Sequence, residues 1–173
     1  KSSIHILARC SINECTFISN SGSLEFIIEV ILKHKEIDSI LLDGCRFITN
    51  CSKDSYLGHG MIDAGVLRLL TRILTKEKED YDLVESSLIA IDSLTMIPAG
   101  RECMCEEELM DIFLTYFKKQ SNEYHIQLCC SILANVSSIE ACHTILTQGV
   151  HSLLVKILSK CKEKKQLATY LLQ

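Results

Sequence analysis

Apolar residues recur along this chain at helical spacing, and the same pattern returns at a nearly constant step. One short stripe follows Gly65 and places Leu67, Leu70, Ile73 and Leu74 on one face of a helix. A related stripe follows Gly22, 43 residues earlier, and another follows Gly149, 84 residues later. The glycine-led stripe is therefore an internal repeat.

The distance from Gly65 to Gly149 is twice the step and predicts one concealed copy between them. We expect this copy over residues 106–116, with Leu109 and Ile112 at its apolar positions. Four copies with a step near 42 residues result.

A longer apolar stripe lies between successive copies. The three long stripes are Ile37, Ile40, Leu41, Cys45 and Ile48; Leu83, Val84, Leu88, Ile91 and Leu94; and Ile126, Cys129, Cys130, Leu133 and Val136. Short amphipathic segments follow them over 54–63, 98–105 and 139–147. Each repeat is therefore expected to contain three helices, and no run of strict alternation predicts a strand.

Residues with special backbone preferences support these boundaries. Pro98 suits the first turn of a helix, and Gly65 and Gly149 suit a left-handed corner. Ser52 is expected to cap the helix through Tyr56. Three carboxylates, at residues 106–108, suit a helix start, where they complement the helix dipole.

A period near 42 residues predicts an all-α solenoid, in which each repeat buries its apolar face on its neighbours. The expected units are a partial repeat over 1–35, three repeats over 36–75, 76–119 and 120–159, and the start of a further repeat over 160–173. Because the apolar pattern continues to the last residue, we expect the chain to be part of a longer array.

Composition narrows the function classes. The formal net charge of −4 and the pI of about 5.9 argue against direct nucleic-acid binding, which needs a basic stripe. The one basic cluster, residues 160–165, is interpreted as a solvated helix face, with a phosphate or acidic-partner site as the alternative. No apolar stretch is long enough to predict a membrane span or a signal peptide.

Ten cysteines raise the question of disulfide, metal or thiol chemistry. None has the paired spacing typical of structural zinc, and Cys45, Cys129 and Cys130 fall on the packing stripes. His125 precedes Cys129 by one turn, but no third orienting group is evident. We expect reduced cysteines, no metal, no cofactor and no catalysis, in a cytoplasmic or nuclear protein.

The corner over residues 62–65 and the long-helix ending over residues 132–137, Ile-Leu-Ala-Asn-Val-Ser, together resemble the armadillo repeat, across essentially the whole chain. This resemblance implies a right-handed superhelical solenoid of three-helix repeats. It also implies a concave groove lined by the long third helices, in which an extended partner peptide lies.

The resemblance implies a ladder of asparagines that hydrogen-bond the main chain of the partner. The corresponding positions are Asn50, Ser93 and Asn135, so one rung is substituted by serine. An amide suits this task because it offers a donor and an acceptor together. The alternative is that Asn50 and Asn135 cap their own helices.

Nuclear-import receptors of the family carry tryptophans one turn earlier on the same face. Here these positions are Arg46, Ile89 and Ser131, and the chain contains no tryptophan. The departure argues against recognition of a basic localisation signal. Arg46 is a candidate partner for an acidic residue, and the alternative is a solvated arginine.

These observations predict a non-catalytic scaffold or adaptor that binds an extended or partly helical segment of another protein. The alternative function is structural assembly, in which exposed repeat ends stack or self-associate and the groove is idle. A zinc or thiol-redox module is the third reading.

Overall fold

The computed structural model describes residue 18 and residues 21–75, 80–139 and 150–161. The helices with defined bounds are α3 (Leu24–Lys33), α4 (Asp38–Cys51), α5 (Ser55–Asp63), α6 (Val66–Ile73), α7 (Tyr81–Thr95), α8 (Pro98–Met104), α9 (Glu107–Lys119), α10 (Glu123–Val136) and α12 (Val150–Cys161). No strand occurs in these described ranges. The all-α prediction is confirmed.

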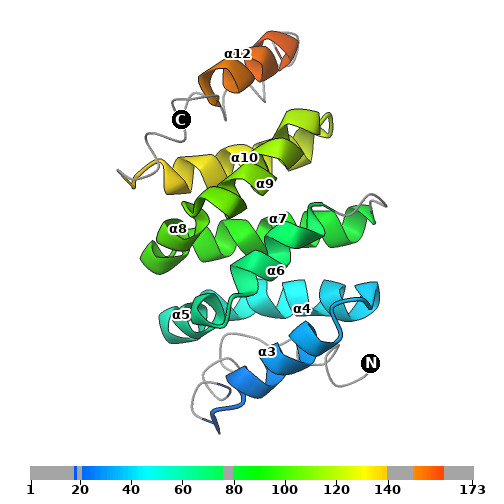
Figure 1. The fold of residues 1–173 in the computed structure, drawn as a ribbon, viewed down its shortest axis with the longest axis vertical. Helices are drawn as coiled ribbons and strands as arrows, with labels where there is room; N and C mark the ends of the chain where they lie inside the picture. Colours follow the sequence, from blue (N-terminus) through cyan, green and yellow to red (C-terminus); the bar gives the residue numbers. More distant parts are fainter. Residues whose placement is uncertain (1–17, 19–20, 76–79, 140–149, 162–173) are drawn as a thin grey trace.

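The helices stack along the longest axis of the molecule (Figure 1). The long helices α4, α7 and α10 pack side by side, and α6 packs on α9 beside them. The short helices α5 and α8 also contact each other. Equivalent helices of successive repeats are therefore neighbours, as expected for a solenoid.

One continuous apolar cluster runs through the stack. Phe47 of α4, Leu88 of α7 and Ile132 of α10 are each 0% exposed. These residues come from three successive long helices, so the core lies between repeats as well as within them. This arrangement explains why the apolar stripes recur with the repeat period.

Two positions in the predicted stripes are wrong. Ile37 is 41% exposed and is the N-cap of α4, because its extended backbone precedes the first helical turn. Ile112 is only partly buried, whereas the larger ring of Phe113 is 0% exposed. Since Phe113 lies four residues after Leu109, it occupies the same helix face and takes the core position instead.

Helix ends follow the predicted residues at three places. Gly65 has a φ of 77° and forms the left-handed corner before α6. Pro98 opens α8, and Glu106 is the N-cap of α9. Gly149 and most of the predicted segment 139–147 lie outside the described residues.

The predicted cap at Ser52 is wrong. Ser52 follows the last turn of α4, and its hydroxyl donates to the Thr49 carbonyl at 2.9 Å. Asp54 caps α5 instead, because its extended backbone lets the carboxylate accept from the Leu57 N–H at 3.1 Å. The cap therefore lies two residues later than expected.

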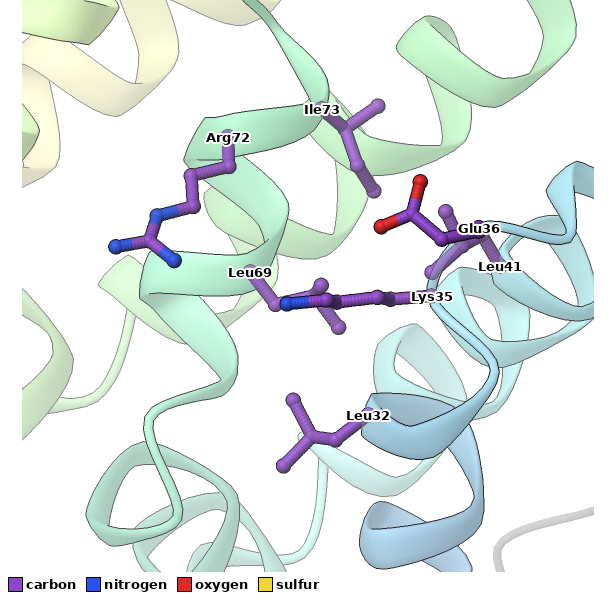
Figure 2. Close-up of a pocket in the computed structure, with 7 residues that line it drawn as sticks. All are labelled: Leu32, Lys35, Glu36, Leu41, Leu69, Arg72 and Ile73. Atoms are coloured by element: carbon purple, nitrogen blue, oxygen red, sulfur yellow. The ribbon is translucent and has the colours of Figure 1, made fainter.

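A hollow lies between α3, the following loop, α4 and α6 (Figure 2). We call it the α3–α6 hollow, and its volume is about 180 Å³. It is lined by Leu32, Lys35, Glu36, Leu41, Leu69, Arg72 and Ile73. Charged side chains stand over a largely apolar floor.

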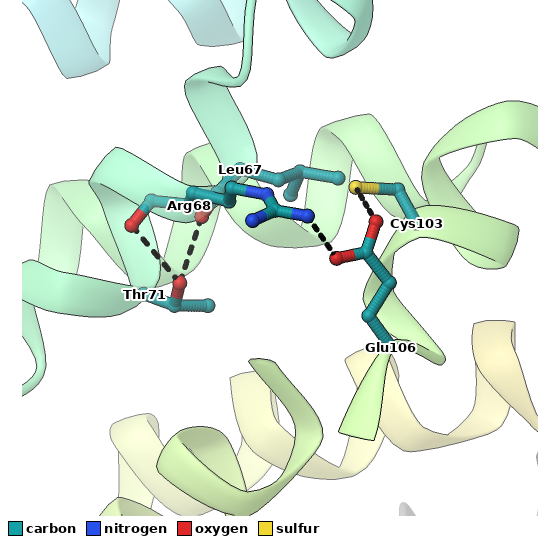
Figure 3. A network of polar contacts seen from close by, with 5 residues as sticks. All are labelled: Leu67, Arg68, Thr71, Cys103 and Glu106. Carbon is teal, nitrogen blue, oxygen red and sulfur yellow. Dashed lines mark hydrogen bonds and ion pairs between the residues drawn. The ribbon is translucent and has the colours of Figure 1, made fainter. Parts of the chain in front are cut away.

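A polar network joins α6 to the start of α9, the equivalent helix of the next repeat (Figure 3). Arg68 of α6 forms an ion pair with Glu106, the N-cap of α9. The Cys103 thiol lies 3.8 Å from the same carboxylate and donates to it. Both charged side chains are about half exposed, so this ion pair adds little stability and mainly fixes the relative position of the two repeats.

No single helix in the described ranges is long and apolar enough to cross a membrane. The bent pair formed by α7 and α8 meets the length and composition criteria only when the two helices are counted together.

Leu70→Ala should destabilise the protein by about 2–5 kcal/mol, because Leu70 is 0% exposed and its removal leaves a cavity between repeats. Phe26→Ala is the matched control, since Phe26 is 68% exposed. Chemical denaturation measures both variants. A free energy of unfolding that is equal in Leu70→Ala and Phe26→Ala would contradict the assigned core.

Gly100→Ala should also destabilise the protein, because a β-carbon at Gly100 would lie 2.1 Å from the Leu94 carbonyl oxygen of α7. Backbone atoms cannot yield as a side chain can. Gly60→Ala is the control, since its β-carbon would meet only the flexible end of Leu24, at 2.8 Å. We expect a lower melting temperature for Gly100→Ala alone; a similar loss in both variants would argue against a specific backbone clash.

Candidate functional site

The exposed side of α4, α7 and α10 carries all six positions that the sequence assigned to partner binding. We call it the long-helix face. Arg46 and Ser131 are exposed, and Asn50, Ile89, Ser93 and Asn135 are partly buried. Each helix buries its opposite side in the core, because the apolar stripe and the candidate positions occupy different faces of one helix.

An open hollow lies between α4 and α7 on this face. We call it the α4–α7 hollow, and its volume is about 440 Å³. It is lined by Arg46, Thr49, Asn50, Glu85, Ser86 and Ile89. Three of the six predicted residues therefore line one hollow.

Both signs of charge line the α4–α7 hollow. The Arg46 side chain is 51% exposed and lies 3.7 Å from Asp43 of its own helix. Glu85 lines the hollow from α7. Asn50 adds an amide, and Ile89 adds apolar surface. The hollow can therefore contact an extended polypeptide through main-chain hydrogen bonds, charge and apolar packing.

At the α7–α10 step, polar groups of the two helices bind each other. The Asn135 amide nitrogen lies 3.2 Å from an Asp92 carboxylate oxygen, 3.1 Å from the Thr95 hydroxyl and 3.5 Å from the Asp92 carbonyl. Ser131 also hydrogen-bonds the Asp92 carboxylate. Ser93 donates to the Ile89 carbonyl at 2.8 Å. Three predicted residues thus have hydrogen-bond partners within the protein.

These bonds change the interpretation of Asn135. Its amide donates to α7 of the preceding repeat and does not cap its own helix, whose C-cap residue is Ser137. The link joins residues 43 positions apart. The donor groups of Asn135 therefore hold two repeats together.

Burial raises the pKa of the Asp92 carboxyl above its ordinary value of 3.8, although hydrogen bonds from Ser131 and Asn135 act in the opposite direction. Burial dominates because water is partly excluded from this carboxylate. Neither Asp92 nor Glu85 was predicted from the sequence. The available signal was the carboxylate at position 92, one residue before the candidate Ser93 within an otherwise apolar stretch.

The cysteines mostly behave as core residues. Burial raises the pKa of the Cys45 thiol to about 11 and that of Cys129 well above its ordinary value, which disfavours the reactive thiolates. The Cys45 sulfur lies 3.5 Å from the Ser87 hydroxyl of the next long helix. His125 shares a hydrogen bond of 2.8 Å with the Tyr116 hydroxyl. These contacts favour packing over nucleophilic catalysis.

Cys105 is disulfide-bonded, so the prediction that every cysteine is reduced is wrong at this residue. The free cysteines in the described ranges are Cys45, Cys51, Cys103, Cys129 and Cys130. The described residues contain no group of three histidine, cysteine or acidic side chains placed to hold a metal ion.

Comparison with solved structures identifies the architecture. A designed armadillo repeat protein in complex with the peptide (KR)4 superposes with a TM-score of 0.77 over 98% of this chain and 71% of the designed chain. The chain has the armadillo fold. The sequence identity is 16%, so the likeness concerns the fold. No family model and no curated protein matches the sequence.

The armadillo fold confirms the predicted solenoid of three-helix repeats. The assignment of the six candidate residues on the long-helix face to partner binding stays a prediction, as do the unit boundaries over 36–75, 76–119 and 120–159.

Asp92→Asn should raise the melting temperature more at pH 7 than at about pH 3. The folded-state pKa of Asp92 is raised, so the native state binds more protons than the unfolded chain between the unfolded and folded pKa values. The contribution of Asp92 to the free energy of unfolding therefore falls as the pH rises from the unfolded pKa through the folded pKa. Below the ordinary pKa of 3.8, wild-type Asp92 is largely protonated and the advantage of the variant shrinks.

Thermal denaturation followed by circular dichroism at both pH values measures this difference. Asp63→Asn, at an exposed position, is the control for loss of one negative charge. An advantage of Asp92→Asn that is the same at both pH values would show that the carboxylate ionises as readily in the folded chain as in the unfolded chain.

Proposed function

We propose that the chain is a non-catalytic protein-binding scaffold, which holds an extended or partly helical segment of a partner protein on its long-helix face. The observation that carries the proposal is the α4–α7 hollow, where Arg46, Asn50, Glu85 and Ile89 come together from two repeats. This set combines an amide, two opposite charges and an apolar surface. A polypeptide is the ligand class that uses all of them.

Binding is centred on the α4–α7 step in this proposal. Asn50 lines the hollow and suits main-chain recognition, because an amide matches both the N–H and the C=O of a peptide. At the next step, Asn135 uses its donors to hold Asp92 and Thr95. The donors of Asn135 therefore serve the contact between repeats, and the proposal places peptide binding at the α4–α7 hollow.

The charges suggest the character of the partner. An acidic side chain of the partner complements Arg46, and a basic one complements Glu85. The structurally similar designed armadillo protein was solved in complex with the peptide (KR)4, which supports peptide binding as a use of this fold. Its ligand is wholly basic, whereas the α4–α7 hollow offers one residue of each sign.

The competing function is structural assembly, in which repeat ends stack and the long-helix face is idle. The two functions differ in what a groove substitution does. In a scaffold, a change at Arg46 alters peptide selection, whereas in an assembly segment it leaves self-association unchanged.

An array of short immobilised peptides, varied in the order of acidic and basic residues, tests the scaffold. We expect Arg46→Glu to weaken binding to peptides with an acidic residue by about fivefold or more, the equivalent of about 1 kcal/mol for one lost ion pair. Glu85→Lys should weaken binding to peptides with a basic residue. Lys118→Glu, at an exposed position on α9, controls for net charge.

Two results would count against the scaffold. One is an array pattern shared by wild type, Arg46→Glu and Glu85→Lys. The other is a molar mass that rises with protein concentration in light scattering while no peptide binds, which would favour assembly.

A further inference from the structure

The α3–α6 hollow is a second concave site, separate from the long-helix face. Leu32 from the end of α3 and Leu69 from α6 point into it from opposite sides (Figure 2). Leu41 and Ile73 complete the apolar floor. The lining comes from helices of two neighbouring repeats.

The floor of this hollow is part of the core. Leu41 is 1% exposed, Ile73 is 2% exposed and Leu69 is 9% exposed, and all three belong to the apolar cluster that runs through the stack. The volume of about 180 Å³ is similar to that of an engineered apolar cavity of about 150 Å³ that admits benzene. One aromatic or branched aliphatic side chain therefore fits.

Two cations stand at the rim. Lys35 and Arg72 are exposed, and neither forms an ion pair with any residue that the structure describes. Figure 2 shows the ends of both side chains on the Leu69 side of the hollow, whereas the Glu36 carboxylate lies toward Ile73. The unpaired positive charge is thus concentrated on one side of the opening.

An occupant must satisfy both features. A simple anion would pair with Lys35 and Arg72 but would leave the volume of the hollow unfilled. A neutral apolar group would fill the hollow but would leave the two cations without counter-charges. An apolar side chain next to carboxylates fills the hollow and neutralises the rim together.

We infer that the α3–α6 hollow is a docking site for a partner protein segment in which an aromatic or branched aliphatic residue is flanked by aspartate or glutamate. The apolar side chain enters the hollow, and the adjacent carboxylates pair with Lys35 and Arg72. This site is independent of peptide binding on the long-helix face. It gives the solenoid a second, acid-selective contact.

The test uses the peptide acetyl-Glu-Asp-Phe-Asp-Glu-amide, titrated into the whole chain with isotope-labelled methyl groups. We expect progressive shifts of the Leu69 and Ile73 methyl signals. The Phe-to-Ala peptide and the uncharged peptide acetyl-Gln-Asn-Phe-Asn-Gln-amide should each bind at least about fivefold more weakly. The substitution Arg72→Glu should weaken binding of the acidic peptide to the same extent or more.

Two control variants distinguish binding at the α3–α6 hollow from a general effect of charge and from binding at the α4–α7 hollow. Lys118→Glu makes the same charge change at an exposed position on α9 and should leave the titration unchanged. Acidic peptides also bind the α4–α7 hollow in the proposed function, so the Leu69 and Ile73 methyl signals are the readout for the α3–α6 hollow. Arg46→Glu, in the α4–α7 hollow, should leave the peptide-induced shifts of these two signals unchanged, so failure of one site is distinguishable from failure of the other.

Three outcomes would overturn the inference. The first is the absence of Leu69 and Ile73 shifts at millimolar peptide. The second is equal binding of the acidic and uncharged peptides, which would remove the role of the cations. The third is binding to phosphatidylserine–phosphatidylcholine vesicles with no response to the peptide, which would assign Lys35 and Arg72 to a membrane surface.

Discussion

The burial of each long helix between two others is the constraint on which this molecule depends. α7 packs on α4 on one side and on α10 on the other, and Leu88 and Ile91 are wholly buried there. A single three-helix repeat cannot cover both flanks of its own long helix, so the interfaces between repeats must supply the remaining core. Each packing position therefore recurs with the period, and the exposed side of each long helix remains available for other roles.

The same constraint decides how much the sequence could predict. Helical periodicity, the positive-φ corner at Gly65 and the first-turn proline at Pro98 are local features, so the elements they mark were found. The choice between Ile112 and Phe113 depends on which side chain the neighbouring helices cover, and a one-dimensional pattern does not contain this information. The cap of α5 shifted from Ser52 to Asp54 because backbone conformation, and not residue type alone, selects the cap.

For the candidate site, the repeat step placed Arg46, Asn50 and Ile89 on one face, and these three residues line one hollow. The spacing of the repeats in the sequence could not predict where the side chain of Asn135 points. Its amide reaches Asp92, which is 43 positions away in sequence and becomes its neighbour only when α7 and α10 pack together. Glu85 was missed for a related reason, since a single carboxylate on a helix resembles an ordinary solvated residue.

The polar bonds at the α7–α10 step have an energetic role. Excluding water from the Asp92 carboxylate has a cost, which the bonds from Asn135 and Ser131 partly offset. Because both donors belong to α10, this compensation exists only when the two repeats are correctly stacked. A half-buried carboxylate thereby favours one alignment of neighbouring helices over others that apolar packing alone would tolerate.

The interfaces between successive repeats differ in how completely they are packed and bonded. This difference affects how easily the repeats move against each other. The α6–α9 step has the Arg68–Glu106 ion pair, and the α7–α10 step has the Asn135 bonds, whereas a hollow lies between α3 and α6. In a stack held together by nearest-neighbour contacts, opening is easier where the packing between neighbours is less complete. Within the row formed by α3, α6 and α9, the α3–α6 contact should therefore open more readily than the α6–α9 contact. A ligand that fills the α3–α6 hollow would reduce this difference.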